Sequence, residues 1–473
     1  MFRNRVRRLH FVGIGGIGMS GIAEVLLTLG YEIHGSDQAV SATSRRLQGL
    51  GMQIHHGHAA AQVAGADVVV TSSAVGTDNP EVQEALRLGI PVIRRAEMLA
   101  ELMRLKYGIA IAGSHGKTTT TSLVATLLER GGFDPTMVVG GRLRATSANA
   151  RLGAGEYLVA EADESDGSFL RLMPTIAVVT NIDAEHLDHW HGGLAAIVEA
   201  FVTFINKVPF YGAAIVCLDH PTVQNLLPRL HRRCITYGLT PQADYVAENV
   251  RVVPEGMAFS VRRGTTLLGP VQLRLIGRHN VQNALAAIAV AEEVGVPFAT
   301  TAAALADFAG IARRFEVKGQ VRDILVVDDY GHHPAEIRAT LAAARAAYLR
   351  RLVVLFQPHR YSRTRDLLED FSSAFNDCQV LLVCDIYGAG EAPLPDIDAA
   401  RLVAMIRAHG HRDVRAVGAV DAAGAHLQAL LQPGDLLLTL GAGNVYQAGD
   451  DLLAALAPPT EAGLHLGQDG KGT

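Results

Sequence analysis

Two glycine-rich loops, each between a predicted strand and a predicted helix, constrain the fold of this chain more than any other feature. The first loop is Gly13-Ile14-Gly15-Gly16-Ile17-Gly18 and follows the apolar run 9–12. The second is Gly113-Ser114-His115-Gly116-Lys117-Thr118 and follows the apolar run 108–112. Short apolar runs that end at glycine and alternate with amphipathic stretches are typical of strand-helix-strand units. The sequence therefore predicts an α/β fold with parallel sheets.

The length of 473 residues favours about three domains. We predict a Rossmann-like domain at 1–107, a central P-loop ATPase-type α/β domain at 108–311, and a second Rossmann-like domain at 312–473. Residues 243–275 alternate polar and apolar side chains, which predicts an antiparallel appendage of the central domain. The predicted strands are 9–12, 31–35, 68–73, 91–93, 108–112, 157–160, 176–180, 213–217, 324–328, 352–356, 380–384 and 435–440.

Composition narrows the classes of partner. The formal net charge of −5 argues against non-specific binding to nucleic acid, so an anionic ligand needs a local binding site. No run approaches the roughly 18 apolar residues of a membrane span. The four cysteines are widely spaced and form no CxxC pair, which favours reduced thiols in the cytoplasm. We expect a cytoplasmic monomer or homodimer that binds small molecules, without nucleic-acid binding or membrane insertion.

The first loop matches the dinucleotide fingerprint in its structural context. Asp37 ends the next predicted strand, about 20 residues further on, as that fingerprint requires. Glycines there allow a tight turn and a close approach of the backbone to a pyrophosphate. Taken alone, the loop favours a nicotinamide dehydrogenase, and a purely structural glycine turn is the other interpretation.

The second loop indicates a nucleoside triphosphate. Its Gly-Lys-Thr ending is that of a phosphate-binding loop, although Ile111 stands where the common pattern has its first glycine. Backbone N–H groups would cradle the phosphates, Lys117 would reach the β and γ groups, and Thr118 would offer its hydroxyl to Mg²⁺. The acid-rich segment 161–166 follows another predicted strand, so some of its carboxylates are candidate metal ligands, with a solvated loop as the alternative.

These motifs, in this order, resemble the Mur ligase family of peptidoglycan synthesis over nearly the whole chain. Besides the two loops, the segments that carry the resemblance are 161–169, 180–189, 277–283, 313–316, 328–334 and 357–363. The first loop and Tyr330-Gly331-His332-His333-Pro334 are most similar to family members that join L-alanine to UDP-N-acetylmuramate. The resemblance implies that the first domain binds the UDP-sugar and the central domain binds ATP. It implies that the third domain binds the amino acid and closes over the site.

The resemblance also assigns residues by position. It implies UDP-sugar contacts at Gly15, Gly16, Ile17, Gly18, Asp37, His58 and Ser72. It implies ATP contacts at Gly113, Ser114, His115, Gly116, Lys117, Thr118, Thr119, Asn280, Asn283, Arg314 and Asp329, with Asp328 as the alternative for the ribose. It implies amino-acid contacts at Tyr330, His332, Arg360 and Arg363, catalytic roles for Lys117 and His332, and Thr118, Glu161 and His186 as ligands of two Mg²⁺ ions.

Two departures from the family pattern are visible. Ser114 stands where the family usually has Thr, which keeps the hydroxyl group. Asp183-Ala184-Glu185-His186 replaces the commoner Glu-Ala-Asp-His, so the lengths of the two acids are exchanged. Whether Glu185 takes part in the site is left open by this exchange.

The implied reaction joins L-alanine to the lactyl carboxylate of UDP-N-acetylmuramate while ATP becomes ADP and phosphate. Because a carboxylate has no useful leaving group, we expect it to attack the γ-phosphate and form an acyl phosphate, from which the alanine amine then displaces phosphate. The sequence does not identify the base, and His332 is a candidate on proximity alone. Three alternatives stay open: a nicotinamide dehydrogenase, a related ligase that adds a tripeptide, and a catalytically silent nucleotide-binding regulator.

Overall fold

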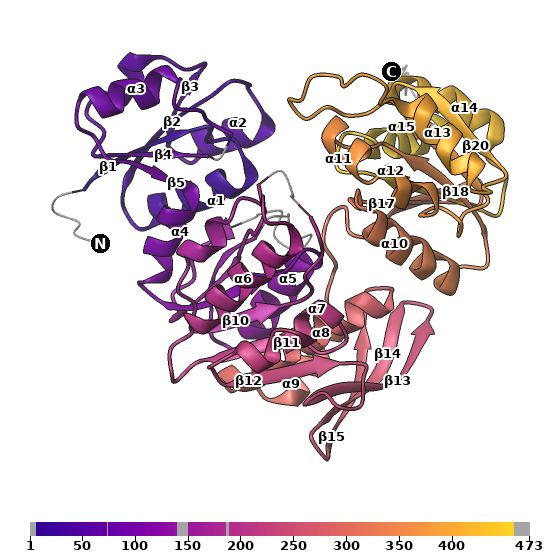
Figure 1. Cartoon of the computed structure of the whole chain (residues 1–473), viewed down its shortest axis with the longest axis horizontal. Helices are drawn as coiled ribbons and strands as arrows, with labels where there is room; N and C mark the ends of the chain where they lie inside the picture. The colour runs from indigo at the N-terminus through magenta and orange to yellow at the C-terminus, as the bar shows by residue number, and fades with distance from the viewer. Residues whose placement is uncertain (1–5, 73, 140–149, 186–188, 458–473) are drawn as a thin grey trace, which may run out of the picture. The chain divides into compact units, whose positions relative to one another are not determined.

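The computed structural model describes residues 6–72, 74–139, 150–185 and 189–457. The chain divides after Ala312 into two compact units. Across the described residues it forms three mainly parallel sheets of five, ten and six strands, shown with their helices in Figure 1. The predicted α/β class is therefore confirmed. Within the same residues, no helix is both long enough and apolar enough to cross a membrane.

The first sheet is all parallel and has the strand order β3-β2-β1-β4-β5. This is a doubly wound arrangement in which the order reverses beside β1, and such a reversal opens a crevice at the carboxyl ends of the strands. Its strands are β1 (Arg8–Val12), β2 (Glu32–Asp37), β3 (Gln53–His56), β4 (Val68–Thr71) and β5 (Val92–Arg94). Its helices are α1 (Ile17–Thr28), α2 (Ala42–Gly49), η1 (Ala60–Val63), α3 (Pro80–Arg87) and α4 (Arg95–Met103).

Both faces of this sheet are covered, because successive side chains of a strand point to opposite sides. Leu9 and Phe11 of β1 belong to the core on the α1 and α4 side. Val12 packs on the other side with Val63 of η1 and Ala85 of α3. Figure 1 shows α1 and α3 on opposite sides of these strands.

The second sheet has the order β15-β14-β13-β12-β11-β10-β6-β9-β7-β8. Its strands are β6 (Tyr107–Ala112), β7 (Thr136–Val138), β8 (Ala150–Arg151), β9 (Tyr157–Glu161), β10 (Ile176–Val179), β11 (Ala213–Cys217), β12 (Cys234–Gly238), β13 (Tyr245–Val253), β14 (Gly256–Arg263) and β15 (Thr266–Leu273). Its helices are α5 (Lys117–Arg130), η2 (Ser168–Arg171), α6 (Gly193–Asn206), α7 (Pro221–Gln224), η3 (Leu227–Arg229), α8 (Arg278–Val294) and α9 (Phe298–Ala306).

The predicted antiparallel stretch is present, and it extends this same sheet. β13 pairs parallel with β12, whereas β14 and β15 continue as an antiparallel meander. At the other end of the parallel part, β6 pairs with both β9 and β10. The segments that follow these three strands therefore leave the sheet side by side, and they are the P-loop, the acid-rich segment and residues 180–185.

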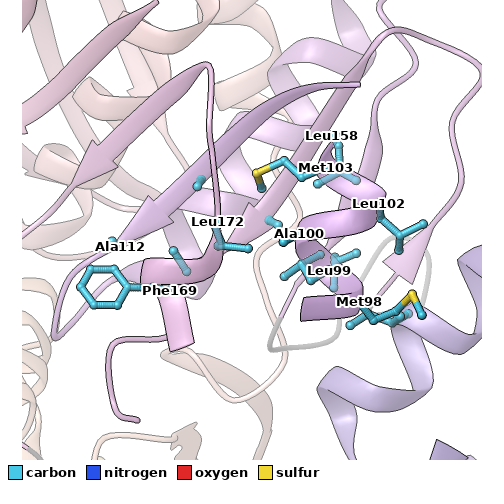
Figure 2. Close-up of a cluster of buried hydrophobic side chains, with 14 of the residues drawn as sticks. Met98, Leu99, Ala100, Leu102, Met103, Ala112, Leu158, Phe169 and Leu172 are labelled. Atoms are coloured by element: carbon cyan, nitrogen blue, oxygen red, sulfur yellow. The ribbon is translucent and has the colours of Figure 1, made fainter. Parts of the chain in front are cut away.

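A buried apolar cluster joins α4 to the second sheet. Figure 2 shows Leu99 and Met103 of α4 near Leu158 of β9 and near Phe169 and Leu172 at η2. All five side chains are at most 2% exposed. This core is continuous across residue 107, so the first two sheets belong to one compact unit.

The second unit holds a six-stranded sheet in the order β16-β17-β21-β18-β19-β20, with only the edge strand β16 antiparallel. Its strands are β16 (Glu316–Val321), β17 (Ile324–Asp329), β18 (Arg351–Phe356), β19 (Val380–Cys384), β20 (Val414–Gly418) and β21 (Asp435–Leu440). Its helices are α10 (Pro334–Ala347), α11 (Tyr361–Asp366), α12 (Leu368–Ser372), α13 (Ala399–Ala408), η4 (Val420–Ala422), α14 (Ala423–Leu430) and α15 (Tyr446–Leu456).

We predict that Phe169→Ala destabilises the first unit by about 3–5 kcal/mol, as truncation of a buried aromatic ring does. Phe169 is 1% exposed and its ring centroid lies 5.0 Å from those of Phe201 and Phe204. Urea unfolding followed by the fluorescence of Trp190 measures the loss, because the chain has one tryptophan and it packs on this core. The control Leu86→Ala, at a residue 61% exposed, should change stability by less than about 0.5 kcal/mol. Equal effects of the two variants would contradict the packing described here.

Candidate functional site

The P-loop is held in shape by the end of β10. The His115 N–H donates to Asn181 Oδ1 at 2.7 Å, and the Asp183 N–H donates to Ser114 Oγ at 2.9 Å. Gly113 has φ of 136° and Gly116 has φ of 80°, both in the region that favours glycine. A Cβ atom on Gly113 would also collide with Thr180 Oγ1. The loop therefore leads from β6 into the N-terminus of α5 with its backbone conformation fixed.

Lys117 is the first residue of α5, and its ammonium group folds back onto the loop. Its Nζ donates to the carbonyl oxygen of Gly113 at 2.6 Å and to the Glu164 carboxylate at 2.8 and 2.9 Å. Burial alone would lower the pKa of Lys117, but Glu164 and Asp163 outweigh it and raise the pKa well above its usual value. Lys117 is thus a fixed positive charge at a helix N-terminus, which is where a phosphate binds.

Two of the three expected metal ligands belong to this framework. Thr118 and Thr119 are buried in the first turn of α5. Glu161 ends β9 and lies in register with Ile111 of β6, just ahead of the loop. A hydroxyl and a carboxylate oxygen are the donors that Mg²⁺ prefers, so these residues fit the ion. His186 lies outside the residues that the structure describes.

His115 of the loop lies in a group of acids and histidines, of which sequence reasoning missed His220. His115 Nε2 lies 3.1 Å from Asp183 Oδ2 and 3.2 Å from Glu185 Oε1, and His220 Nε2 lies 3.3 Å from Asp183 Oδ1. Hydrogen bonds from His115 and His220 hold the pKa of Asp183 far below its usual value. Glu185, whose part the sequence left open, therefore contacts a residue of the P-loop. His220 gave no sequence signal except its position just after a buried strand.

Asn280 and Asn283 of α8 reach the same loop. Asn283 Oδ1 accepts from Thr120 Oγ1 at 3.2 Å, and Asn283 Nδ2 donates to Asn280 Oδ1 at 3.2 Å. A Cβ atom on Gly116 would lie 2.6 Å from Asn283 Oδ1. Both asparagines are buried; Asn283 packs against Gly116 of the P-loop, and Asn280 is joined to it through Asn283.

The residues expected to bind the UDP-sugar gather at the carboxyl ends of β1, β2 and β4. The Gly15 N–H donates to Asp37 Oδ2 at 2.8 Å, so the acid that ends β2 contacts the glycine loop. Gly16 precedes α1, whose first residues are Ile17 and Gly18. The Ser72 hydroxyl lies beside Gly13 of the loop. His58 follows β3, and its Nδ1 lies 2.9 Å from Ser36 Oγ.

Arg313 is bound entirely within the second unit. Its guanidinium donates to Asp328 at 3.1 Å and to the carbonyl oxygens of Gly441 and Gly443. It also lies over the rings of Tyr330 and Tyr446, at 5.0 and 4.7 Å. Arg313 therefore organises this site, and its neighbour Arg314 also lies over the ring of Tyr330, at 5.2 Å.

Asp329 supports the chain that carries Tyr330 and His332. Its carboxylate accepts the N–H groups of Phe315 at 2.7 Å and Gly331 at 2.8 Å. Burial raises its pKa to about 6. The structure thus gives Asp329 local backbone partners, and its contact with a ribose stays a prediction.

His332 lies in a buried polar corner. Its Nδ1 lies 3.1 Å from the carbonyl oxygen of Tyr330, so that nitrogen carries the proton and donates. Burial lowers the pKa of His332 to about 3, and the positive charge of Arg363 acts in the same direction. The ring is therefore neutral near pH 7 and resists protonation, which weighs against His332 as the base that takes the amine proton.

Arg360 and Arg363 flank one face of this corner. Arg363 Nη1 lies 3.3 Å from His359 Nδ1 and 3.3 Å from the His359 carbonyl oxygen. Arg360 is half-exposed and lies 4.0 Å from Glu391. Burial lowers the pKa of His359 to about 4, with Arg363 as the next cause. Two guanidinium groups next to neutral imidazoles form a positive site suited to a carboxylate.

Comparison with known proteins matches each part of the chain. Residues 8–107 match the family model described as "Mur ligase family, catalytic domain". Residues 111–291 match "Mur ligase middle domain", and residues 313–443 match "Mur ligase, glutamate ligase domain". The UDP-N-acetylmuramate--L-alanine ligase of Anaeromyxobacter dehalogenans (strain 2CP-C) is 59% identical over 96% of this chain and 99% of its own length. The protein of the same name from Geobacter sp. (strain M21) is 58% identical over 97% and 99%.

Comparison with solved structures also finds ligases of this kind. The UDP-N-acetylmuramate-alanine ligase of Thermotoga maritima superposes with a TM-score of 0.80 at 26% identity, covering 95% of this chain and 98% of that one. A murein peptide ligase from Psychrobacter arcticus gives a TM-score of 0.70, also at 26% identity and with the same coverage. Since the family models together span most of residues 8–443 and relatives align over nearly the whole length, the chain belongs to the Mur ligase family.

Proposed function

We propose that this protein is an ATP-dependent ligase that joins L-alanine to the lactyl carboxylate of UDP-N-acetylmuramate, a step in making peptidoglycan precursors. The observation that carries the proposal is the 58–59% identity, over nearly the full length, to curated ligases with that activity in their names. The fixed P-loop and its charged Lys117 support ATP as the energy source. We further propose that it acts in the cytoplasm as a monomer or homodimer.

We assign the substrates to the domains as the motifs suggest. Residues 1–107 hold the UDP-sugar through the first glycine loop, Asp37, His58 and Ser72. Residues 108–311 hold ATP, with the adenine near Asn280 and Asn283. Residues 312–473 hold L-alanine, whose carboxylate pairs with Arg360 and Arg363 beside Tyr330 and His332, while Arg314 and Asp329 serve the nucleotide.

The P-loop residues act on the phosphates. Backbone N–H groups of 113–118 and the N-terminus of α5 surround them, and Lys117 exchanges its contact with Glu164 for the transferring γ-phosphoryl group. The lactyl carboxylate attacks this phosphorus and expels ADP, which gives an acyl phosphate. The alanine amine then attacks the acyl carbon, expels phosphate and loses a proton to form the amide. Two Mg²⁺ ions, held by Thr118, Glu161 and His186, would neutralise charge on the phosphates. Lys117 supplies the same kind of stabilisation from the protein itself.

The test of the proposed function is phosphate release by the full-length protein. We expect release only when ATP, Mg²⁺, UDP-N-acetylmuramate and L-alanine are all present, because the acyl phosphate needs both co-substrates to turn over. A coupled phosphate assay with a panel of amino acids and the murein tripeptide measures it. A preference for the tripeptide would reassign the substrate, and release without the UDP-sugar would reject the proposal.

We predict that Lys117→Ala lowers kcat by at least two to three orders of magnitude, on the order of the loss of one preorganised charge at a transition state. Circular dichroism should show the fold retained. Lys318→Ala is the control, because Lys318 pairs with Asp450 at 3.0 Å on the outer strand β16. Substantial turnover by the Lys117 variant would remove this loop from the reaction.

We predict that Arg363→Ala raises KM for L-alanine about ten- to hundredfold, the effect of losing a hydrogen bond between charged groups worth about 1.5–3 kcal/mol. KM for ATP should stay within about twofold. Arg365→Ala removes the same charge from the same helix, where Arg365 pairs with Asp366 at 2.7 Å, and should leave both constants unchanged. If the two variants behave alike, Arg363 does not bind alanine.

A further inference from the structure

A buried carboxylate lies on the α3 side of the first sheet, behind the residues proposed to hold the UDP-sugar. Glu81, near the start of α3, is 0% exposed. Among the described residues its ion-pair partners are the imidazoles of His10 and His58, at 3.3 and 3.6 Å, rather than a lysine or an arginine. A carboxylate is costly to bury unless hydrogen bonds compensate for its lost hydration, so the residues that bind Glu81 determine its state.

The hydrogen bonds of Glu81 hold it in the ionised state. Its Oε2 accepts from Ser36 Oγ at 2.6 Å and from His10 Nε2 at 3.3 Å, and its Oε1 accepts the Ala59 N–H at 3.4 Å. Burial alone would raise the pKa of Glu81, but the hydrogen bonds from His10 and Ser36 outweigh it and lower the pKa below its usual value. An ionised carboxylate can only accept hydrogen bonds.

This acceptor fixes the direction of the next hydrogen bond. Ser36 has one hydroxyl hydrogen, and the 2.6 Å contact places it on the line to Glu81. Ser36 Oγ lies 2.9 Å from His58 Nδ1, and toward that nitrogen it can only accept. His58 Nδ1 therefore carries a proton, and in the neutral imidazole the other nitrogen, Nε2, keeps its lone pair.

His58 follows the carboxyl end of β3, at the edge of the sheet where the UDP-sugar is proposed to bind. Ser36 and Asp37 are consecutive at the end of β2, and the Gly57 N–H donates to the Asp37 carbonyl oxygen at 2.8 Å. The segment that carries His58 is thereby tied to the same edge as the glycine loop. The His58 side chain is 13% exposed, and its Nε2 makes no hydrogen bond with any residue that the structure describes.

We propose that Glu81 is a positioning residue for sugar-nucleotide binding. Through Ser36 it holds His58 in the Nδ1–H tautomer, so that Nε2 accepts a hydrogen bond from a donor on the uridine, either the imide N–H or a ribose hydroxyl. The inference rests on the proposed function, because it needs a uridine nucleotide at this edge. In the neutral ring, the buried network thus makes Nε2 of His58 a hydrogen-bond acceptor.

The tautomer can be measured on the free protein. We expect ¹⁵N–¹H spectra of full-length protein labelled at histidine nitrogens to show His58 protonated at Nδ1, with the resonance assigned by its loss in His58→Gln. In Ser36→Ala, which removes the relay, we expect His58 to shift toward the Nε2–H form. A wild-type His58 protonated at Nε2 would overturn the proposal, whether or not any variant folds.

Kinetics test the consequence for binding. In Ser36→Ala and Glu81→Gln we expect KM for UDP-N-acetylmuramate to rise about tenfold, which corresponds to one hydrogen bond of about 1.4 kcal/mol. We expect kcat, and likewise KM for ATP, to change less than twofold. The lost hydrogen bond would stabilise the bound UDP-sugar equally in the ground state and the transition state. Glu84→Gln is the matched control, because Glu84 lies on the same helix and pairs with exposed Arg87. An unchanged KM in variants that have lost the tautomer would overturn the proposal.

Two substrate analogues identify the donor. One analogue of UDP-N-acetylmuramate is methylated at N3 of uracil, and the other lacks the ribose hydroxyls. The wild-type protein should bind one of the two more weakly than the normal substrate. Ser36→Ala should bind that analogue no more weakly than it binds the normal substrate. If neither analogue behaves in this way, His58 is not the acceptor. Failure of the wild-type protein to form product with the normal substrate would reject the proposed function instead, and the tautomer measurement would be unaffected.

Discussion

The pairing of β6 with β9 on one side and β10 on the other is the constraint on which the candidate site depends. Each of these strands ends in a segment rich in polar groups, and parallel pairing brings the three ends together. Hydrogen bonds join these segments: Asn181 accepts one from the P-loop backbone, and Glu164 accepts one from Lys117. The protein's own hydrogen bonds thereby hold the proposed phosphate-binding loop in shape, which lowers the cost of ordering it.

The two glycine loops have the same strand-loop-helix arrangement but different charged groups beside them. Both leave a buried strand and open a helix, and both meet polar groups from a neighbouring strand. In the first loop the partner is the carboxylate of Asp37, which can accept hydrogen bonds from a ligand's hydroxyl groups. In the second loop the helix begins with Lys117, whose charge suits the more anionic triphosphate. Loop geometry alone therefore does not identify the ligand, whereas the side chains around it narrow the choice.

Largely buried histidines make hydrogen bonds in both units. His332 is kept neutral by burial beside Arg363, and Asp183 is kept ionised by His115 and His220. In the first sheet the Glu81 network fixes the protons of two further imidazoles. For His332, a neutral ring also avoids most of the cost of burying an ion.

Apolar runs determined which segments became central strands, because such runs are stable only when buried on both faces of a parallel sheet. The predictions fit β1, β6, β10 and β18, but they missed β3, β8, β16 and β20 at sheet edges and β7 and β12 inside the second sheet. Of the edge strands, β3 and β16 have the polar sequences QIHH and EVKGQV. Edge strands are held by backbone pairing to a neighbour, and that pairing leaves no hydrophobic period in the sequence.

The sequence by itself determined the α/β class and the two glycine loops between a strand and a helix, because those properties depend on residues a few positions apart. Only the tertiary structure decided that Glu81 meets His58, that His220 meets Asp183 and that Arg313 is held by Tyr446. The partners in these pairs are far apart in the chain, and their side chains have no local pattern that distinguishes them from solvated residues. Contacts of this kind arise from strand order and helix placement, which local spacing does not encode.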